Sequence, residues 1–186
     1  MKYTNILNGK LKGRKIKIVS TPKTRPTLSK VKEAIFQFID VSDGDLVLDM
    51  FAGTGALGIE CLSQGASFVQ FVEKNPINAK LIRTNLKDLK IDNSQYGILV
   101  NDFKIGLKKF SKVYNIVLID PPFEKVNYYY DALIMLQKNK LINEDTQIMV
   151  ESRKLHNIEI PEIYNIEKQK FYGDSRIDIL TLKKWN

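Results

Sequence analysis

Two short motifs contain the residue types most able to do chemistry, and the first is a glycine-rich turn that follows an acidic residue. Asp49 ends an apolar run, and a turn containing Gly53 and Gly55 comes directly after it. These glycines let the backbone turn sharply and approach a ligand closely, because neither carries a Cβ that would clash. The turn fits the dinucleotide fingerprint, and Glu73, at the end of the next predicted strand, stands where such sites place a ribose-binding acid. We therefore expect a nucleotide-like cofactor.

The charge of Asp49 favours one kind of cofactor over another. A carboxylate at the end of the strand would repel the pyrophosphate of NAD, whereas it would attract the cationic sulfonium and amino groups of S-adenosylmethionine. A dehydrogenase would also leave the segment 120–123, which closes a later apolar run, without a use. The sequence therefore favours S-adenosylmethionine.

The second motif, Asp120-Pro121-Pro122-Phe123, suits the presentation of a planar base with an exocyclic amine to an electrophilic methyl group. The Asp120 carboxylate and the Pro121 carbonyl are adjacent acceptors that can take both N–H bonds of one amine. Phe123 can stack on the base, which contributes about 1 to 3 kcal/mol in other base–aromatic stacks. The prolines lack an N–H and stiffen the turn, so the acceptors keep their geometry.

The composition indicates one domain. The chain has 186 residues, 44% of them hydrophobic and 27% charged, which is enough for a proper core. The start lacks the apolar region of a signal peptide, and no apolar run approaches the ~20 residues that cross a bilayer. We therefore expect a cytoplasmic protein with no membrane partner. The lone Cys61 and the lone His156 offer no metal site, and we expect the first in the core and the second in solvent.

Positive charge is concentrated at the start of the chain. The formal net charge is +8, and residues 1–32 hold ten of the 29 basic residues but no Asp or Glu. Lys and Arg gathered on one face supply the sequence-independent part of nucleic-acid affinity. The basic residues that we expect to contact nucleic acid are Lys10, Lys12, Arg14, Lys15, Lys17 and Arg25.

Strand and helix signals alternate along the chain. Residues 6–19 have hairpin character, with turn signals at Asn8-Gly9 and Lys12-Gly13. Strands are predicted at 46–49, 68–72, 96–100, 116–119 and 146–150, helices at 27–39, 56–64, 75–89 and 128–137, and a closing hairpin that ends with a strand at 176–182. This alternation predicts an α/β fold with a doubly wound, mostly parallel seven-stranded sheet and a small basic N-terminal β-hairpin.

Acidic residues stand at or just after the carboxyl ends of four successive predicted strands. They are Asp49, Glu73, Asp102 and Asp120. Ligands of doubly wound sheets bind beyond the carboxyl ends of the strands, near the switch point of the strand order. The sequence therefore predicts four acids along one edge of the sheet.

Together these motifs resemble the RsmD family, methyltransferases of the class I Rossmann-like fold that methylate the N2 amine of one guanine in bacterial 16S ribosomal RNA. The resemblance covers nearly the whole chain and is carried by the segments 9–16, 25–27, 31–36, 48–58, 71–74 and 120–123. The glycine-rich and Pro-Pro turns are shared by many amino methyltransferases, whereas segment 25–27 and the basic hairpin are more particular to this family. Asn8 and the segment 101–103 depart from its pattern.

The resemblance implies a role for each motif. Asp49 and the turn 53–55 would hold the methionine part of S-adenosylmethionine, Glu73 the ribose hydroxyls and Asp102 the adenine amine. The implied cofactor-binding set is Asp49, Phe51, Gly53, Gly55, Glu73 and Asp102, and the implied catalytic set is Asp120, Pro121, Pro122 and Phe123. The partner would be 16S rRNA or a small-subunit assembly intermediate, and no metal is implied. Residues 1–186 would form one methyltransferase domain, with 1–25 as its basic RNA-binding extension.

Three other functions fit part of the sequence. Adenine-N6 and protein-glutamine methyltransferases use similar Pro-Pro turns; the basic hairpin disfavours a protein substrate, and the lack of a separate target-recognition domain disfavours sequence-specific DNA. A non-catalytic RNA-binding or ribosome-assembly protein on a methyltransferase fold would not need intact cofactor and target motifs. A NAD dehydrogenase leaves the Pro-Pro turn unexplained.

Overall fold

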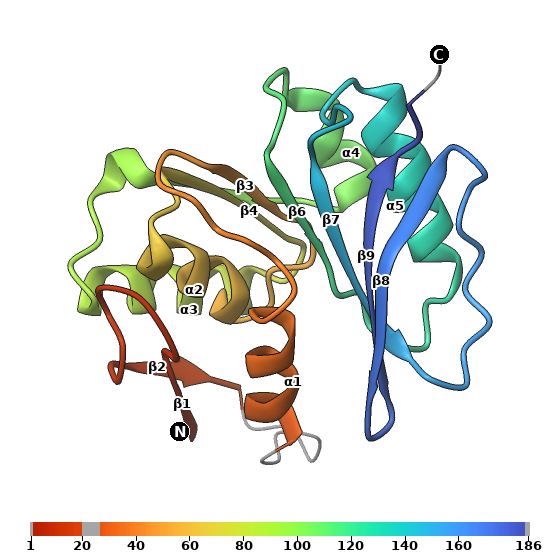
Figure 1. Cartoon of the computed structure of the whole chain (residues 1–186). Helices are drawn as coiled ribbons and strands as arrows, with labels where there is room; N and C mark the ends of the chain where they lie inside the picture. The colour runs from red at the N-terminus through yellow and green to blue at the C-terminus, as the bar shows by residue number, and fades with distance from the viewer. Residues whose placement is uncertain (1, 20–26, 185–186) are drawn as a thin grey trace.

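A seven-stranded sheet runs through the centre of the computed structural model, which describes residues 2–19 and 27–184 (Figure 1). The strand order is β5-β4-β3-β6-β7-β9-β8. The parallel strands are β3 (Leu46–Asp49), β4 (Phe68–Glu73), β5 (Tyr96–Val100), β6 (Ile116–Ile119) and β7 (Gln147–Arg153). The antiparallel pair β8 (Tyr164–Tyr172) and β9 (Ser175–Leu182) completes the sheet beside β7. The predicted α/β class and doubly wound sheet are confirmed, and the strand order reverses between β3 and β6.

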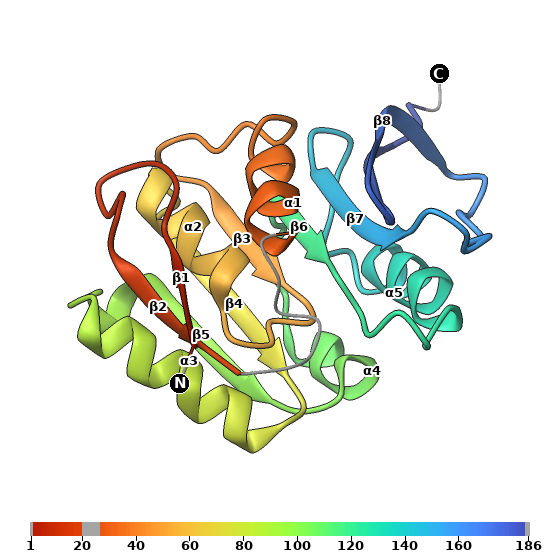
Figure 2. The ribbon, with the colours of Figure 1, turned by 90° about the horizontal axis from the view of Figure 1, so that it is seen from below.

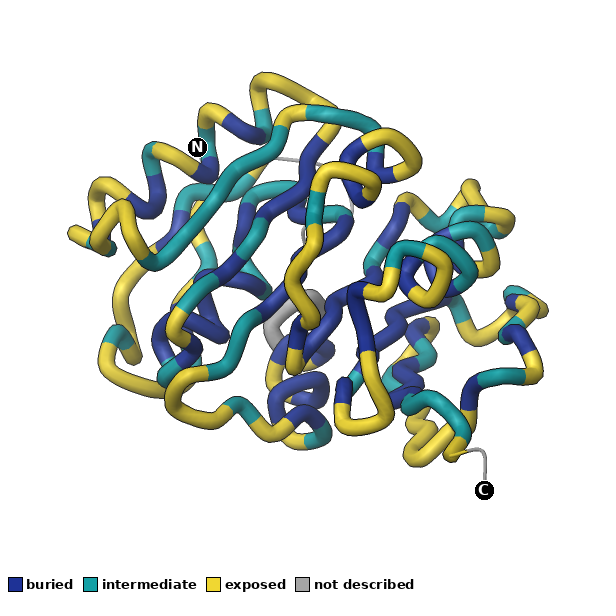
Figure 3. Tube along the Cα trace, turned by 90° about the horizontal axis from the view of Figure 1, so that it is seen from above, coloured by how far each residue is buried: buried dark blue, intermediate teal, exposed yellow. Residues whose placement is uncertain are grey.

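Helices cover both faces of this sheet, and each face has its own apolar core. One face carries α1 (Thr27–Ile35), α2 (Ala56–Gln64) and α3 (Pro76–Asp88), and the other carries α4 (Phe103–Gly106) and α5 (Asn127–Lys138). Two short 3-10 helices lie at Asn93–Gln95 and Leu107–Lys109. Phe71 and Ile59 belong to the first core, and Tyr129 and Leu133 to the second. Buried residues run through the middle of the trace and exposed ones gather along its outer turns (Figure 3). None of the described helices is long and apolar enough to span a membrane.

Two elements end three or four residues from their predicted ends, and the hairpin begins at Lys2, four residues before its predicted start at Ile6. The helix predicted to reach residue 39 ends at Ile35 and continues as a turn. Strand β7 runs to Arg153, three residues beyond its predicted end, because its ladder with β9 continues to the pair Arg153–Ser175. Cys61 is buried in the first core, as expected.

The N-terminal hairpin pairs β1 (Lys2–Asn5) with β2 (Lys15–Ile18) and lies against α2 and α3 (Figure 2). Its residues Ile6 and Ile16 are buried in the first core. The sequence predicted an appended hairpin, but these residues make it part of the packing on that face of the sheet.

Buried polar groups hold the hairpin in place. Glu60, on α2 and wholly buried, accepts hydrogen bonds from the backbone N–H groups of Leu7 and Asn8, and its carboxylate lies 3.0 Å from the Lys32 ammonium. Asn85, on α3, accepts from the Lys17 N–H and donates to the Lys17 carbonyl. Since an unpaired buried donor or charge is costly, these bonds specify where the hairpin lies.

Two glycines of the hairpin turn offer a matched test of this packing. Gly9 (φ +77) and Gly13 (φ +81) share a left-handed backbone, but a Cβ at Gly9 would lie 1.8 Å from the Ser63 carbonyl oxygen, whereas one at Gly13 would meet nothing within 4 Å. Gly13→Ala should cost about 1–2 kcal/mol of unfolding free energy, the penalty of that backbone for alanine. Gly9→Ala should lower the unfolding free energy by clearly more, because the added Cβ would push the turn away from α2. Urea unfolding of both variants measures this, and equal decreases in stability would show that the packing of the turn on α2 adds none.

Candidate functional site

The structure places the four predicted acids in a row. Asp102 follows β5, Glu73 ends β4, Asp49 ends β3 and Asp120 follows β6, so they follow the strand order along the carboxyl edge of the sheet. We call this edge, with the loops that leave it, the rim. The middle of the row coincides with the reversal of strand order between β3 and β6, which is where ligands of such sheets bind.

Asp49 is nearly fully buried, and its side chain caps helix α2 although the residue itself lies on β3. Helix α2 begins after Gly55, which has no side chain to accept a hydrogen bond, and the Asp49 carboxylate instead accepts one from the Gly58 N–H at 3.1 Å. The pKa of Asp49 is raised to about 7, chiefly by burial; the hydrogen bond from the Gly58 N–H opposes this rise and the nearby Glu73 adds to it. A cation beside Asp49 would therefore favour its ionised form.

Glu73 supports the glycine-rich turn through two backbone N–H groups. Its carboxylate accepts from the Gly53 N–H at 2.7 Å and from the Asn75 N–H at 2.7 Å. Gly53 has φ +55, and a Cβ there would meet only the Phe51 carbonyl oxygen, at 3.9 Å, so the space before the turn is open. Because an ionised carboxylate has about four acceptor sites, Glu73 keeps capacity for the hydroxyl groups of a ligand.

An aromatic cleft lies beside Glu73, at the end of the row that carries Asp102. The ring centroid of Phe51 lies 4.9 Å from that of Phe103 and 6.1 Å from that of Tyr128. The cleft has about 280 Å³ of empty volume, including the part open to solvent, and is lined by Met50, Phe51, Val72, Lys74, Asn101, Asp102, Phe103, Pro122 and Tyr128. Such a surface suits a flat heterocycle, with the Asp102 carboxylate available to accept from an amine.

Sequence reasoning identified Phe51, Asp102 and Pro122 of this cleft but missed Phe103 and Tyr128. Phe103 directly follows a predicted site acid, which was a usable signal. Tyr128 belongs to a run of three tyrosines, and only the packing of α5 against the sheet shows which of them lines the cleft.

Asp120 lies at the opposite end of the row, beside an acid that sequence reasoning did not single out. In the parallel ladder of β6 and β7, Ile119 pairs with Val150, so Asp120 and Glu151 are the next residues of the two strands. Glu151 is 6% exposed and accepts a hydrogen bond from the Ser175 hydroxyl at 3.0 Å. Burial, then Glu151 and then Asp49 hold the pKa of Asp120 well above its usual value.

Phe123, the last residue of the Pro-Pro motif, contacts residues at and just beyond the end of β7. Pro121 is buried, Pro122 exposed and Phe123 half-buried. The Arg153 guanidinium lies 5.2 Å from the centroid of the Phe123 ring, and the His156 ring meets Phe123 edge-on at 6.5 Å. The expectation that His156 is solvated was wrong, because this contact leaves it half-buried.

The basic residues predicted to contact nucleic acid lie on the hairpin and differ in their surroundings. Lys10, Lys12 and Lys15 are exposed. Arg14 donates to the Asp88 carbonyl at 3.2 Å, and the Lys17 ammonium pairs with the Asp88 carboxylate at 2.6 Å, which raises the pKa of Lys17. Arg25 lies outside the described residues. Of the five that are described, the three exposed lysines are therefore the most available to a phosphate backbone.

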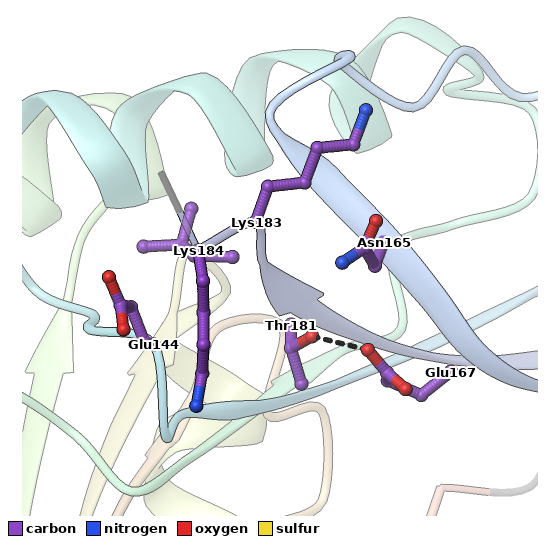
Figure 4. A pocket seen from close by; sticks show the side chains of 7 residues that line it. Glu144, Asn165, Glu167, Thr181, Lys183 and Lys184 are labelled. Atoms are coloured by element: carbon purple, nitrogen blue, oxygen red, sulfur yellow. Dashed lines mark hydrogen bonds between the residues drawn. The ribbon is translucent and has the colours of Figure 1, made fainter. Parts of the chain in front are cut away.

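A larger hollow lies at the other edge of the sheet and contains none of the predicted residues. It has about 750 Å³ of empty volume, including open solvent, and is lined by Glu144, Asn165, Glu167, Thr181, Leu182, Lys183 and Lys184 (Figure 4). Its charges are mixed, and the Thr181 hydroxyl is bonded to Glu167. Size alone therefore does not locate the site. Within the described ranges no group of three or more His, Cys, Asp or Glu side chains could hold a metal ion.

Known proteins are similar to this chain over nearly its whole length. The family described as conserved hypothetical protein 95 matches residues 4–181. A ribosomal RNA small subunit methyltransferase D from Buchnera aphidicola is 32% identical over 166 residues, which cover 89% of this chain and 86% of that protein; one from Haemophilus influenzae is 32% identical over 174 residues, covering 90% and 88%. A solved Escherichia coli structure described as a methyltransferase has a TM-score of 0.85 and 26% identity, covering 99% of this chain and 100% of that one.

These likenesses identify the class of protein first. A doubly wound sheet with this rim is the fold of the class I Rossmann-like methyltransferases. Within that class the chain belongs to the RsmD family, which confirms the resemblance seen in the sequence.

Proposed function

We propose that this chain is an S-adenosylmethionine-dependent methyltransferase that modifies the N2 amine of a guanine in 16S ribosomal RNA. The observation that carries the proposal is the position of Asp49 and Asp120 at the carboxyl ends of the two strands that flank the switch point. One acid is placed to attract a cationic methyl donor and the other to hold an amine. Curated relatives named ribosomal RNA small subunit methyltransferase D support the RNA substrate, and such a substrate implies a cytoplasmic enzyme.

Different residues at the rim fit the methionine, ribose and adenine portions of S-adenosylmethionine. The open space before Gly53 would take the methionine portion, with Asp49 nearby. Glu73 would accept from the ribose hydroxyls, and the cleft of Phe51, Phe103 and Asp102 would hold the adenine. When bound, this cofactor supplies an electrophilic methyl group on a positively charged sulfur.

Asp120 would position the target amine and would not deprotonate it beforehand. The lone pair of the guanine N2 amine is delocalised into the ring, and its proton is far too weakly acidic for a carboxylate to remove in the ground state. The Asp120 carboxylate and the Pro121 carbonyl would instead accept both N–H bonds, aim the lone pair and stabilise the positive charge that develops on nitrogen. The methylated amine then becomes acidic enough to lose a proton, to Asp120 or to water.

A pair of glycines tests the cofactor assignment. Gly53 (φ +55) and Gly173 (φ +56) have the same backbone conformation, and a Cβ at Gly173 would meet nothing within 4 Å. Gly53→Val and Gly173→Val therefore carry similar backbone strain, but only the first places a branched side chain in the open space of the turn. Calorimetry should show at least a tenfold loss of S-adenosylmethionine affinity in Gly53→Val and no loss in Gly173→Val. Equal affinities, or tight binding of NAD in place of S-adenosylmethionine, would contradict the assignment.

Two substitutions at Asp120 test the chemistry. Asp120→Ala should abolish most turnover and leave S-adenosylmethionine affinity nearly intact, whereas Asp120→Asn, which keeps one acceptor oxygen, should retain more activity than Ala. Single-turnover methylation of small-subunit RNA, followed by mapping of the modified nucleotide, measures both. Methyl groups on adenine N6 or on protein glutamine would favour the alternative enzymes, and cofactor binding without any transfer would favour a binding protein.

Charge removal on the hairpin tests its interaction with RNA. Lys10, Lys12 and Lys15 changed together to Gln should weaken RNA binding and lower the slope of log affinity against log salt by roughly 0.7–0.9 for each phosphate that the hairpin no longer neutralises. Three exposed lysines on the other side of the sheet, Lys108, Lys109 and Lys138, changed in the same way are the control. Deleting residues 1–25 is a poorer test, since it would remove Ile6 and Ile16 from the core. An unchanged salt slope in the hairpin variant would mean that these lysines face solvent and do not contact RNA phosphates.

A further inference from the structure

Glu151 is a buried acid next to the proposed catalytic acid, and the activity proposed above assigns it no role. The ladder pair of Ile119 with Val150 makes Asp120 and Glu151 neighbours across two strands, and both lie on the same face of the sheet because side chains alternate along a strand. Strand β7 continues past β6 and pairs Glu151 with Ile177 of β9. Glu151 is therefore held by backbone pairing on the side away from Asp120.

The described charged groups near this pair are acids, or cations that face other partners. Asp49 acts on Asp120 from β3, and the pKa of the Tyr129 hydroxyl, on α5, is raised by burial and then by Asp120 and Glu151. The Tyr129 hydroxyl is buried and has no hydrogen-bond partner among the described residues. Arg153 stacks on Phe123, and Arg176 lies 2.7 Å from Asp178.

Ionising both carboxyl groups, of Asp120 and of Glu151, is consequently costly. Burial raises the pKa of Glu151 to about 7, opposed by the Ser175 hydroxyl, and the pKa of Asp120 is raised by burial and by the charge of Glu151. Two adjacent carboxyl groups that no described lysine or arginine pairs with are expected to lose their protons in two separate steps that belong to the pair. Near neutral pH the state expected for the ligand-free protein is one proton on two carboxyl groups.

We propose that Asp120 and Glu151 share one proton while the rim holds no cation, and that a cation bound at the rim expels this proton. Glu151 is then a positioning residue, which acts through Asp120 by setting its charge. The identity of the cation, the sulfonium of S-adenosylmethionine, rests on the proposed function, whereas the shared proton does not.

The ligand-free protein tests the shared proton. A titration that follows the carboxyl carbons of Asp120 and Glu151 by NMR should show Asp120 deprotonating at clearly lower pH in Glu151→Gln, which keeps the size of the side chain and removes its charge. Ser175→Ala should move the Glu151 transition to higher pH, because it removes a hydrogen bond to the ionised form. Ser152→Ala, at a buried serine on the other face of β7, should move neither. An Asp120 transition that is the same in wild type and Glu151→Gln overturns the pair.

Calorimetry in buffers of different ionisation enthalpy tests the coupling. Near pH 7, binding of S-adenosylmethionine to the wild-type protein should release up to about one proton. S-adenosylhomocysteine, which lacks the sulfonium charge, should release clearly less, and Glu151→Gln should remove the difference between the two ligands. Binding of S-adenosylmethionine with no more proton release than S-adenosylhomocysteine overturns the inference alone. No binding of either ligand overturns the proposed function, and the NMR titration then still decides whether the pair exists.

Discussion

The site depends on one constraint, that parallel strands bring their carboxyl ends to the same edge of a sheet. Four of the strands here end in an acid or are closely followed by one, so these acids must lie close together where water is partly excluded. Backbone N–H groups satisfy three of them: Gly58 donates to Asp49, Gly53 and Asn75 to Glu73, and Lys104 to Asp102. N–H dipoles stabilise the carboxylates but leave their net charge in place, so the rim remains attractive to a cation.

Acids elsewhere in the same protein are handled differently. The buried Glu60 lies 3.0 Å from the Lys32 ammonium, and the buried Asp178 lies 2.7 Å from the Arg176 guanidinium. The first pair connects α1 to α2 and the second lies within β9, and in both the charge of the acid is already paired with a basic side chain. Asp49, Asp120 and Glu151 are buried or half-buried as well, but within the described residues no lysine or arginine pairs with them. The contrast supports the rim as a binding site and the other buried acids as part of the scaffold.

Much of the fold could be predicted because its signals are local. Apolar runs, the glycine-rich turn and the Asn75-Pro76 helix start are all written in consecutive residues, so the strands, helices and acidic edge followed from them. Glu151 directly follows the predicted strand 146–150 and so carries the same signal as the other four acids, but the sequence reasoning did not use it, and only the pairing with β9 shows that Glu151 stays in the sheet. Tyr128 could not be found from consecutive residues, because its place in the cleft depends on how α5 packs, and neither could Glu60, whose backbone partners Leu7 and Asn8 lie more than fifty residues away.

The proposed carboxyl pair also bears on how such an enzyme could complete a cycle. Methyl transfer from a sulfonium to an amine moves one positive charge from sulfur to nitrogen, and the nitrogen then loses a proton. An isolated carboxylate of ordinary pKa would pass that proton to water at neutral pH, leaving the acids at the rim to repel one another once the cation is gone. A pair that shares one proton would retain it and so relieve the repulsion between Asp120 and Glu151. The next cation would then have to expel the proton again, so the affinity of the rim for methyl donor over spent product should rise as the pH passes through 7.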